Sequence, residues 1–590
     1  MIKDTITKAL QVATGLKDIT LEPPENEEFG DYSSNIALQM TVMKDNKEGK
    51  GEVKKSSKET ADEVVSKLKS DEKLSKIIER IEVAGPGFIN VWLNKDVLIN
   101  NLIQIDSKKE NYGKVNDLQG KKYLLEHTSP NTIKTLHVGH VRNNITGMAV
   151  HNILEYAGAE VKLDAINNDR GIHVMKAIWA YMKYGQGKKP EVDKEKPDHF
   201  VDKFYQMGAK EAEENTQSRE EMQELLRRWE AEDGEVREIW KKLRDWTLEG
   251  FEETYGRLGS RHDHQWFESD FYQYGKDIVS EGLQKKVFKK LPDGAVLTDL
   301  QAYKLPDTII LRADGTSMYH TQDLYLTKLK REKFPSDLYI WDVGPEQKLY
   351  LKQLFAMCEQ LGIGKISDYF HLSFGIVDIK GTGKMSSRAG NVISADWLID
   401  EIVKKAGEII NKSETGREFS VEEKGKISEM VGLGAIKYGF LKLARETDIN
   451  FDIRESLSLE GNSGPYLQYT YARSQSVLTK SKRGDTKKEV VLENLMNQQF
   501  NNEELSLMKT LYRFPEIISM SAKNYSPNIL CNYLYDLAQK FNVFYNKHGI
   551  LEERTKSKEI TEYRLFLTSA TGQILKNGLN LLGIDAPEKM

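Results

Sequence analysis

The chain has 590 residues, 39% of them hydrophobic and 30% charged, and its formal net charge is −5 at pH 7. This length predicts several domains that each bury a core, and the near-neutral balance excludes nucleic-acid binding through a bulk positive field. The two cysteines, Cys358 and Cys531, are too few for a disulfide framework or a thiolate metal cluster, which favours a reducing, cytoplasmic setting. The first residues carry no apolar signal-peptide core and no window is apolar enough for a span, so we expect no membrane association.

Residues 1–115 mix helical patterns with two segments of a different kind. EEFGDYSSN at 27–35 and AGPGFINVWLN at 84–94 contain Gly, Pro and alternating apolar residues, as strands and turns do. We predict a small α+β domain over 1–115. A scaffold or dimerisation module is the plainer alternative to a binding role.

The pattern then changes to buried strands followed by helices. Apolar runs at 122–126 and 160–167 flank a helical pattern that begins near His137, which predicts a βαβ unit and a parallel sheet. Free N–H groups at such a helix start bind phosphate. His137 and His140 can reach the phosphates of a nucleotide, and Gly139 has no side chain to block a flat ring. This stretch is the predicted nucleotide site.

A long helical and strongly charged stretch follows, from Asp169 to about Arg257. Strand-like segments return after it, at 295–297, 308–311 and 338–341. We therefore predict a Rossmann-like domain over 116–395 that is split by a helical insertion at about 171–295.

The triplet His262, Asp263 and His264 contains metal-ligating residue types. Consecutive strand residues point to alternate faces, however, and no cysteine joins them. We favour an ordinary surface loop and predict no metal site.

A second loop, KGTGKMSSRAGNVI at 380–393, follows an apolar strand pattern at 370–379. Its three glycines predict mobility, and its positive and hydroxyl side chains suit a flap that closes over a polyphosphate. These side chains are Lys380, Lys384, Ser386, Ser387 and Arg388. A basic surface loop without function is the alternative.

From about Asp396 to the end, the spacing of apolar residues predicts almost uninterrupted helix. We divide it into a helical stem at 396–465 and a helical domain at 466–590. Aromatic residues at helical spacing over 529–545 predict a core, and tyrosines on the remaining face could stack on unpaired bases.

Taken together, these motifs resemble the arginyl-tRNA synthetase family within the class I aminoacyl-tRNA synthetases. HVGH at 137–140 and KMSS at 384–387 resemble the two class I signatures. The likeness extends from about residue 25 to residue 590. It rests further on FGDYSSN at 29–35, AGPGFIN at 84–90, SPN at 129–131, YHTQDL at 319–324, GPEQKLYLKQLF at 344–355, EGNSGPYLQYTYAR at 460–473 and LLGIDAPEKM at 581–590.

The resemblance implies a multidomain α/β protein. A Rossmann-like parallel-sheet core split by a helical insertion would carry a small α+β N-terminal domain and an all-α anticodon-binding bundle. Such an enzyme forms arginyl-adenylate from L-arginine and ATP, releases pyrophosphate and transfers arginine to the 3′ end of tRNA(Arg). Mg²⁺ would accompany ATP, adenylate formation would await bound tRNA, and we expect a monomer with no tightly bound cofactor or zinc.

An enzyme that selects arginine must pair a planar guanidinium with carboxylates. The resemblance assigns this pocket to Glu126, Ser129, Asn131, Tyr319, Asp323 and Gln347. It assigns ATP to His137, Gly139, His140, Lys384, Met385, Ser386, Ser387 and Arg388, with His137, His140, Lys134 and Lys384 acting in catalysis. Plausible tRNA contacts are Phe29, Asn35, Tyr545 and Met590.

One departure from the family pattern concerns the flap. The common class I signature is Lys-Met-Ser-Lys-Ser, whereas Ser387 stands in the fourth place here and Arg388 comes one residue later. Many members of the family lack that second lysine and have one ahead of the histidine signature, where Lys134 stands. We predict that Lys134 compensates for the missing charge.

Two rival interpretations stay open at this point. One is a synthetase-like RNA-binding protein without catalysis, which arginine-dependent pyrophosphate exchange would exclude. The other is a nucleotidyltransferase of similar fold acting on a small molecule. Such an enzyme has no evident use for the N-terminal domain and the C-terminal bundle, and a tRNA-binding test would separate the two.

Overall fold

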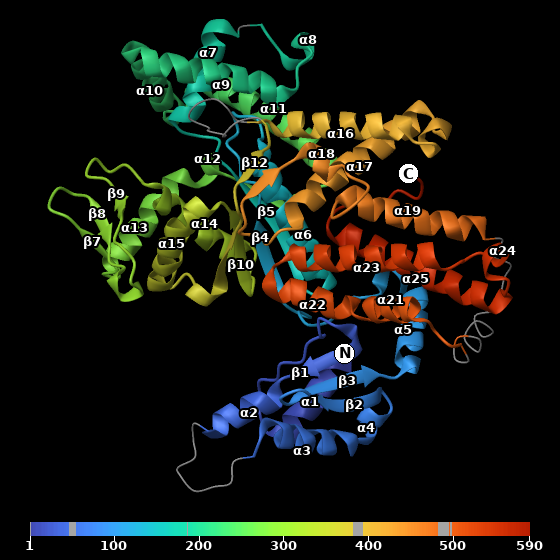
Figure 1. The fold of residues 1–590 in the computed structure, drawn as a ribbon. Coiled ribbons are helices and arrows are strands. Elements are labelled where there is room, and N and C mark those ends of the chain that lie inside the picture. Colours follow the sequence, from blue (N-terminus) through green and yellow to red (C-terminus); the bar gives the residue numbers. More distant parts are fainter. Residues whose placement is uncertain (1, 46–54, 186, 382–392, 482–494, 496–497) are drawn as a thin grey trace.

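The computed structural model describes residues 2–45, 55–185, 187–381, 393–481, 495 and 498–590. A small N-terminal domain lies at one end of the molecule, the parallel sheet lies in the middle, and the C-terminal helices pack between the two (Figure 1). The architecture is the multidomain α/β fold expected from the sequence.

The N-terminal domain is an antiparallel three-stranded sheet, in the order β1-β3-β2, covered by helices. Its apolar side chains form a core of their own, separate from the main core. Ser56 and Glu59 form a capping box that fixes the start of α3. The elements are α1 (Ile2–Thr14), β1 (Tyr32–Ser34), α2 (Ile36–Asp45), α3 (Ser57–Lys69), α4 (Glu72–Ser75), β2 (Ile78–Ala84), β3 (Phe88–Leu93) and the connecting α5 (Lys95–Lys108).

The central sheet has five strands in the order β11-β10-β4-β5-β6, and every neighbouring pair is parallel. The predicted βαβ unit is confirmed, because α6 connects β4 to β5. The direction of winding reverses between β4 and β10, which makes this the switch point of a doubly wound sheet. The elements are β4 (Lys122–Glu126), α6 (Val138–Tyr156), β5 (Glu160–Asn167), β6 (His264–Phe267), β10 (Leu338–Val343) and β11 (Tyr369–Ser373).

Helices cover both faces of this sheet. Leu124 and Leu125 are adjacent on β4 and point to opposite faces, because strand side chains alternate. Leu125 belongs to the large core that contains α6, whereas Leu124 belongs to a second core with the helices of the opposite face. Those helices are α14 (Tyr319–Lys333) and α15 (Lys348–Leu361).

The helical insertion follows β5 and has its own aromatic-rich core. It contains α7 (Ile172–Tyr184), α8 (Pro190–Asp193), α9 (Pro197–Glu214), α10 (Thr216–Glu230) and α11 (Gly234–Leu258). The structure differs here from the predicted insertion at 171–295, because β6 returns to the central sheet beside β5 within that range. Four residues are too few to show a strand period in sequence.

A small antiparallel sheet, β7-β8-β9, is formed by the part of the chain that follows the helical insertion and precedes α14. The strand-like segments predicted at 295–297 and 308–311 therefore exist, but they belong to this sheet and not to the central one. A strand pattern in the sequence predicts that a strand forms, but it does not predict which strand it pairs with. The elements are α12 (Glu268–Phe271), α13 (Gly275–Gln284), β7 (Phe288–Lys290), β8 (Val296–Thr298) and β9 (Ile309–Leu311).

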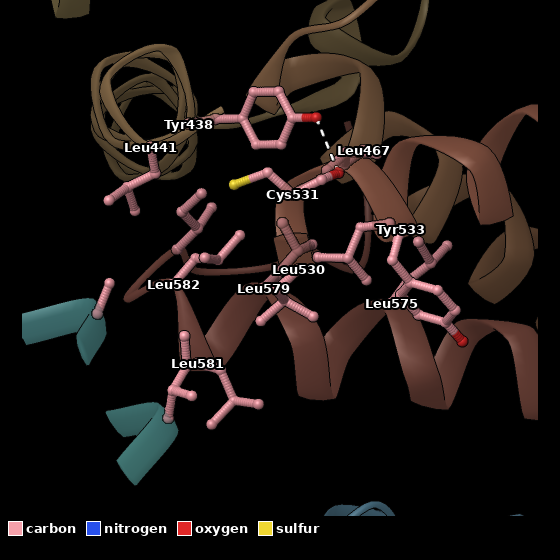
Figure 2. Packing of buried hydrophobic residues seen from close by; sticks show 14 of the residues in the cluster. Tyr438, Leu441, Leu467, Leu530, Cys531, Tyr533, Leu575, Leu579, Leu581 and Leu582 are labelled. Carbon is pink, nitrogen blue, oxygen red and sulfur yellow. Dashed lines mark hydrogen bonds between the residues drawn. The ribbon is translucent and has the colours of Figure 1, made fainter. Parts of the chain in front are cut away.

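The C-terminal part is a helical bundle, interrupted by β13, which pairs in parallel with β12. Figure 2 shows its packing, where the Tyr438 hydroxyl donates to the Cys531 carbonyl at 3.1 Å among buried leucines. In the described part of the chain, no helix is both long and apolar enough to cross a membrane. The elements are β12 (Val377–Ile379), α16 (Ala395–Lys412), α17 (Val421–Leu441), β13 (Ile449–Phe451), α18 (Ile453–Ser456), α19 (Gly464–Lys480), α21 (Asn502–Tyr512), α22 (Phe514–Asn524), α23 (Pro527–Lys547), α24 (Glu552–Thr555) and α25 (Lys558–Leu581).

Candidate active site

A cleft of about 820 Å³ opens at the carboxyl ends of β4 and β10. This is the switch point of the sheet, where doubly wound folds bind their ligands, and the volume suits a small-molecule site. The predicted site residues that line it are Glu126, Ser129, His137, Gly139, His140, Tyr319, Asp323 and Gln347.

The two signature histidines lie at the first turn of α6. His137 caps the helix, and its Nδ1 accepts a hydrogen bond from the Gly139 N–H at 3.1 Å. His140 Nδ1 accepts one from the His137 N–H at 3.1 Å, and the ring centres are 3.8 Å apart. Because each Nδ1 accepts, each neutral ring carries its proton on Nε2, which leaves two N–H donors for phosphate.

Both rings are uncharged at neutral pH. Burial, assisted by the nearby charge of Lys134, lowers the pKa of His137 to about 4. Burial also lowers the pKa of His140, with His137 and Lys134 adding to the effect. The pair therefore offers hydrogen-bond donors and carries no formal charge.

The elbow between β4 and α6 has a strained backbone. Thr128 has a φ of +53°, which is rare for a β-branched residue. Asn143 Oδ1 accepts a hydrogen bond from the Thr128 N–H, and Asn144 Nδ2 donates to Thr128 Oγ1 at 3.2 Å. Gly139 has a further reason to lack a side chain, because a Cβ there would lie 2.9 Å from the His137 ring.

Beyond the histidines the cleft continues over the segment 374–377. The Arg445 carbonyl holds this segment, since it accepts hydrogen bonds from the Gly375 N–H at 2.9 Å and from Arg142 Nη2 at 3.0 Å. Arg142 is a buried residue of α6 that the motifs did not single out. It connects the histidine helix to the strand segment across the cleft.

Most of the predicted flap lies outside the described residues, including the predicted site residues Lys384, Met385, Ser386, Ser387 and Arg388. At the start of the flap, Lys380 forms an ion pair with Asp452 at 3.0 Å. The chain after it forms a β-bridge between Ser394 and His137, so the flap ends beside the histidine pair.

The other end of the cleft is lined by carboxylates. Asp323, on α14, accepts a hydrogen bond from the Tyr350 hydroxyl. Burial raises the pKa of Asp323 to about 6 and Glu126 adds to the rise, although the Tyr350 bond opposes it. Glu126, the last residue of β4, accepts a hydrogen bond from Ser129 Oγ at 3.1 Å. Two exposed residues of this end are Tyr319 and Gln347.

Three residues of this end were not singled out from the sequence: Glu268, Lys330 and Tyr350, although Tyr350 lies within the motif at 344–355. Lys330 follows Asp323 by two helical turns, so helical periodicity alone places both on one face of α14. Glu268 follows the short strand β6 and had no comparable signal. Burial raises the pKa of Glu268 to about 7, in spite of a nearby arginine, Arg170.

Two predicted residues lie beside the cleft and not among the described residues that line it. Asn131 forms a β-bridge with Asn168, which does line the cleft. The Lys134 ammonium lies 4.6 Å from the centre of the Tyr205 ring in the insertion. Its charge reaches both histidines, so Lys134 stands next to the proposed phosphate end.

The side chains of the 262–264 triplet have separate partners. The His262 ring stacks on His127 with centres 4.5 Å apart, and Asp263 accepts a hydrogen bond from the Leu163 N–H at 2.9 Å. His264 packs edge-on against Trp266.

A different group, Asp198, His199 and Asp396, has possible ligand atoms within 4.8 Å of one another. The Lys196 ammonium lies 2.8 Å from Asp396 and 3.3 Å from Asp198 and balances these carboxylates.

The residues predicted to contact tRNA lie in the two end domains. Phe29 is 52% exposed, as base stacking requires, whereas Asn35, Tyr545 and Met590 are half-buried. An ion pair of 2.7 Å between Glu27 and Lys540 and one of 2.8 Å between Asp31 and Lys509 connect the N-terminal domain to the bundle.

A parallel sheet wound in this order, with a histidine pair at its first crossover helix and a cleft at its switch point, is the arrangement expected of a class I aminoacyl-tRNA synthetase, and the family model below shows that class. The family model described as "tRNA synthetases class I (R), catalytic domain" matches residues 101–453. An arginyl-tRNA synthetase N-terminal domain model matches 1–93, and the DALR anticodon-binding domain model matches 467–590. The chain belongs to the arginyl-tRNA synthetase family.

Individual proteins agree with this placement. The chain is 38% identical to the arginine–tRNA ligase of Treponema denticola, over 97% of this chain and 95% of that protein. It is 36% identical to the arginine–tRNA ligase of Phocaeicola vulgatus, over 91% of each. The solved arginyl-tRNA synthetase of Thermus thermophilus has the same fold, with a TM-score of 0.81 and 23% identity over the full length of both chains.

Proposed function

We propose that this chain joins L-arginine to the 3′ end of tRNA(Arg) in two steps, through arginyl-adenylate and with release of pyrophosphate. One observation carries the proposal: Asp323 and the pair His137 and His140 line a single cleft at the switch point of the sheet. The carboxylate end suits a guanidinium, and the end with the N–H donors suits a triphosphate.

Selection of arginine depends on charge and on shape. A guanidinium offers a planar fork of donors that a carboxylate such as Asp323 can accept in two parallel bonds, whereas the lysine ammonium is a single point charge. Citrulline has the shape without the charge and would leave a buried carboxylate unpaired. Glu126, Ser129, Asn131, Tyr319 and Gln347 would hold the remaining polar groups of the substrate.

At the nucleotide end, positioning and charge account for the chemistry. The arginine carboxylate attacks the α-phosphorus in line with the leaving pyrophosphate, and no general base is required because it is already ionised. The Nε2–H groups of His137 and His140 donate to phosphate oxygens, and Gly139 makes room for the adenine. Lys134 and the flap residue Lys384 supply positive charge as negative charge develops. Mg²⁺ enters with ATP as part of the substrate.

The tRNA would span the molecule. The N-terminal domain would contact its outer corner through Phe29 and Asn35, and the bundle would contact the anticodon through Tyr545 and Met590. We propose further that adenylate formation requires bound tRNA, and that the protein acts as a cytoplasmic monomer.

The test is pyrophosphate exchange and charging with purified protein. We expect arginine-dependent exchange of pyrophosphate into ATP that requires tRNA(Arg), and charging with arginine but not with lysine or citrulline. Charging with citrulline would overturn the role given to Asp323 and Glu126. Absence of exchange together with tight tRNA binding would favour the rival of an inactive RNA-binding protein, which no observation supports at present.

A further inference from the structure

Two carboxylates face each other beneath the amino-acid end of the cleft. Glu126 on β4 and Asp164 on β5 are register partners in neighbouring parallel strands. Both are buried, with 5% and 0% of their surface exposed. Like charges opposite each other on a sheet destabilise it, and two buried carboxylates at such a position call for a cation that balances them.

Lys330 supplies that cation. Its side chain is buried, and its ammonium donates to Glu126 and lies 2.8 Å from an oxygen of Asp164. The ammonium is also 5.5 Å from the centre of the Trp341 ring. The same oxygen, Oδ2 of Asp164, also accepts a hydrogen bond from the Trp266 indole N–H at 2.8 Å. The ammonium is therefore held between the two strands, beside the Trp341 ring.

The same helix carries the proposed guanidinium partner. Asp323 and Lys330 are seven residues apart on α14, and both line the cleft. A guanidinium that enters the cleft meets Asp323, which has no lysine or arginine bonded to it in the described chain, and Glu126, which is already paired. Of the two carboxylates in the cleft, Glu126 is therefore balanced by the Lys330 ammonium, whereas Asp323 remains available to the substrate.

We propose that Lys330 is a positioning residue for arginine recognition: as a built-in counter-ion it holds the Glu126 side chain in place at the edge of the cleft, and it leaves Asp323 as the carboxylate that pairs with the substrate cation. The inference rests on the proposed placement of arginine between Glu126 and Asp323. Loss of the ammonium would leave Glu126 and Asp164 opposed with no cation between them, and Glu126 would lose the position that the ammonium gives it.

The test is the KM for arginine at pH 7 in a set of full-length variants. In Lys330→Met we expect the KM to rise by at least about tenfold, because the two opposed carboxylates lose their counter-ion and Glu126 loses its position. Lys330→Arg keeps the charge and should retain a KM near that of the wild type. Lys330→Met/Asp164→Asn removes one charge of each sign and should recover most of the affinity for arginine.

Lys328→Met is the matched control, because this partly exposed lysine on the same helix pairs with Glu281 away from the cleft. The KM for ATP should stay unchanged in every variant. An unaltered arginine KM in folded Lys330→Met would overturn the proposal, as would an equal defect in the double variant. If Lys330→Met does not fold, Asp164→Asn decides, since it leaves Lys330 paired with Glu126. Its KM should stay near wild type, and a tenfold rise would overturn the proposal. Wild-type protein that fails to charge tRNA with arginine would instead refute the proposed function.

Discussion

The two ends of the cleft are suited to ligands of opposite charge, and they differ in how they meet that charge. In the proposed function, the amino-acid end receives a cation, and it presents buried carboxylates whose pKa values are raised, to about 6 at Asp323 and about 7 at Glu268. The nucleotide end would receive a polyanion, yet its two histidines are uncharged because burial lowers their pKa values. Selection of the cation would therefore depend on ionised groups, whereas the anion would meet oriented N–H donors with the positive charge of Lys134 beside them.

The largest effect is expected at the amino-acid end. Asp323→Asn removes the charge that faces the guanidinium, and loss of one partner of a buried pair costs about 3–5 kcal/mol, or roughly 10²–10⁴-fold in kcat/KM for arginine. The KM for ATP should barely change. Glu332→Gln, an exposed change on the same helix, serves as the control. Equal losses for arginine and ATP would show that the two ends are not separate.

At the nucleotide end, the test is to remove a positive charge. Lys134→Ala should slow pyrophosphate exchange by about 10²-fold, the effect typical of losing one transition-state contact, and by more than Arg388→Ala does. The exposed Lys210 of the insertion offers a control as Lys210→Ala. A larger loss with Arg388→Ala would sink the idea that Lys134 replaces the second flap lysine.

The sequence predicted this division only in part, for physical reasons. Motifs with local spacing, such as the HVGH turn, identified the histidines, because strand, elbow and helix start are neighbours in the chain. The Lys330 contact with Asp164 joins residues 166 positions apart in the chain and depends on the register of two strands, which periodicity does not fix. Tyr350 reaches Asp323 from the next helix in the same way. The sequence gives the side chains of Lys330 and Tyr350, but it does not predict which residues they contact.

A smaller effect should appear in the pH dependence of arginine use. Because Asp323 and Glu268 have raised pKa values, both gain protons as pH falls from 8 to 6, and kcat/KM for arginine should fall with them, by up to about tenfold per unit for each group. Glu268→Gln removes the ionisation near pH 7. Its profile should be flat from pH 8 down to about 6.5 and then bend where Asp323 gains its proton. An unchanged bend near 7 would assign that ionisation to another group.

The smallest expected effect is the most direct contrast between the two ends. With saturating arginine, tRNA and Mg²⁺, kcat/KM for ATP should hardly vary between pH 6 and 8, because His137 and His140 titrate below this range in the free nucleotide site. Substitution of His140 by Asn, which keeps an N–H donor and cannot ionise, should lower kcat/KM for ATP by a constant factor across the range. A wild-type profile that falls as pH rises through 7 would mean that a charged histidine binds the phosphates. In that case the two ends would recognise their ligands by the same means, through ionised groups.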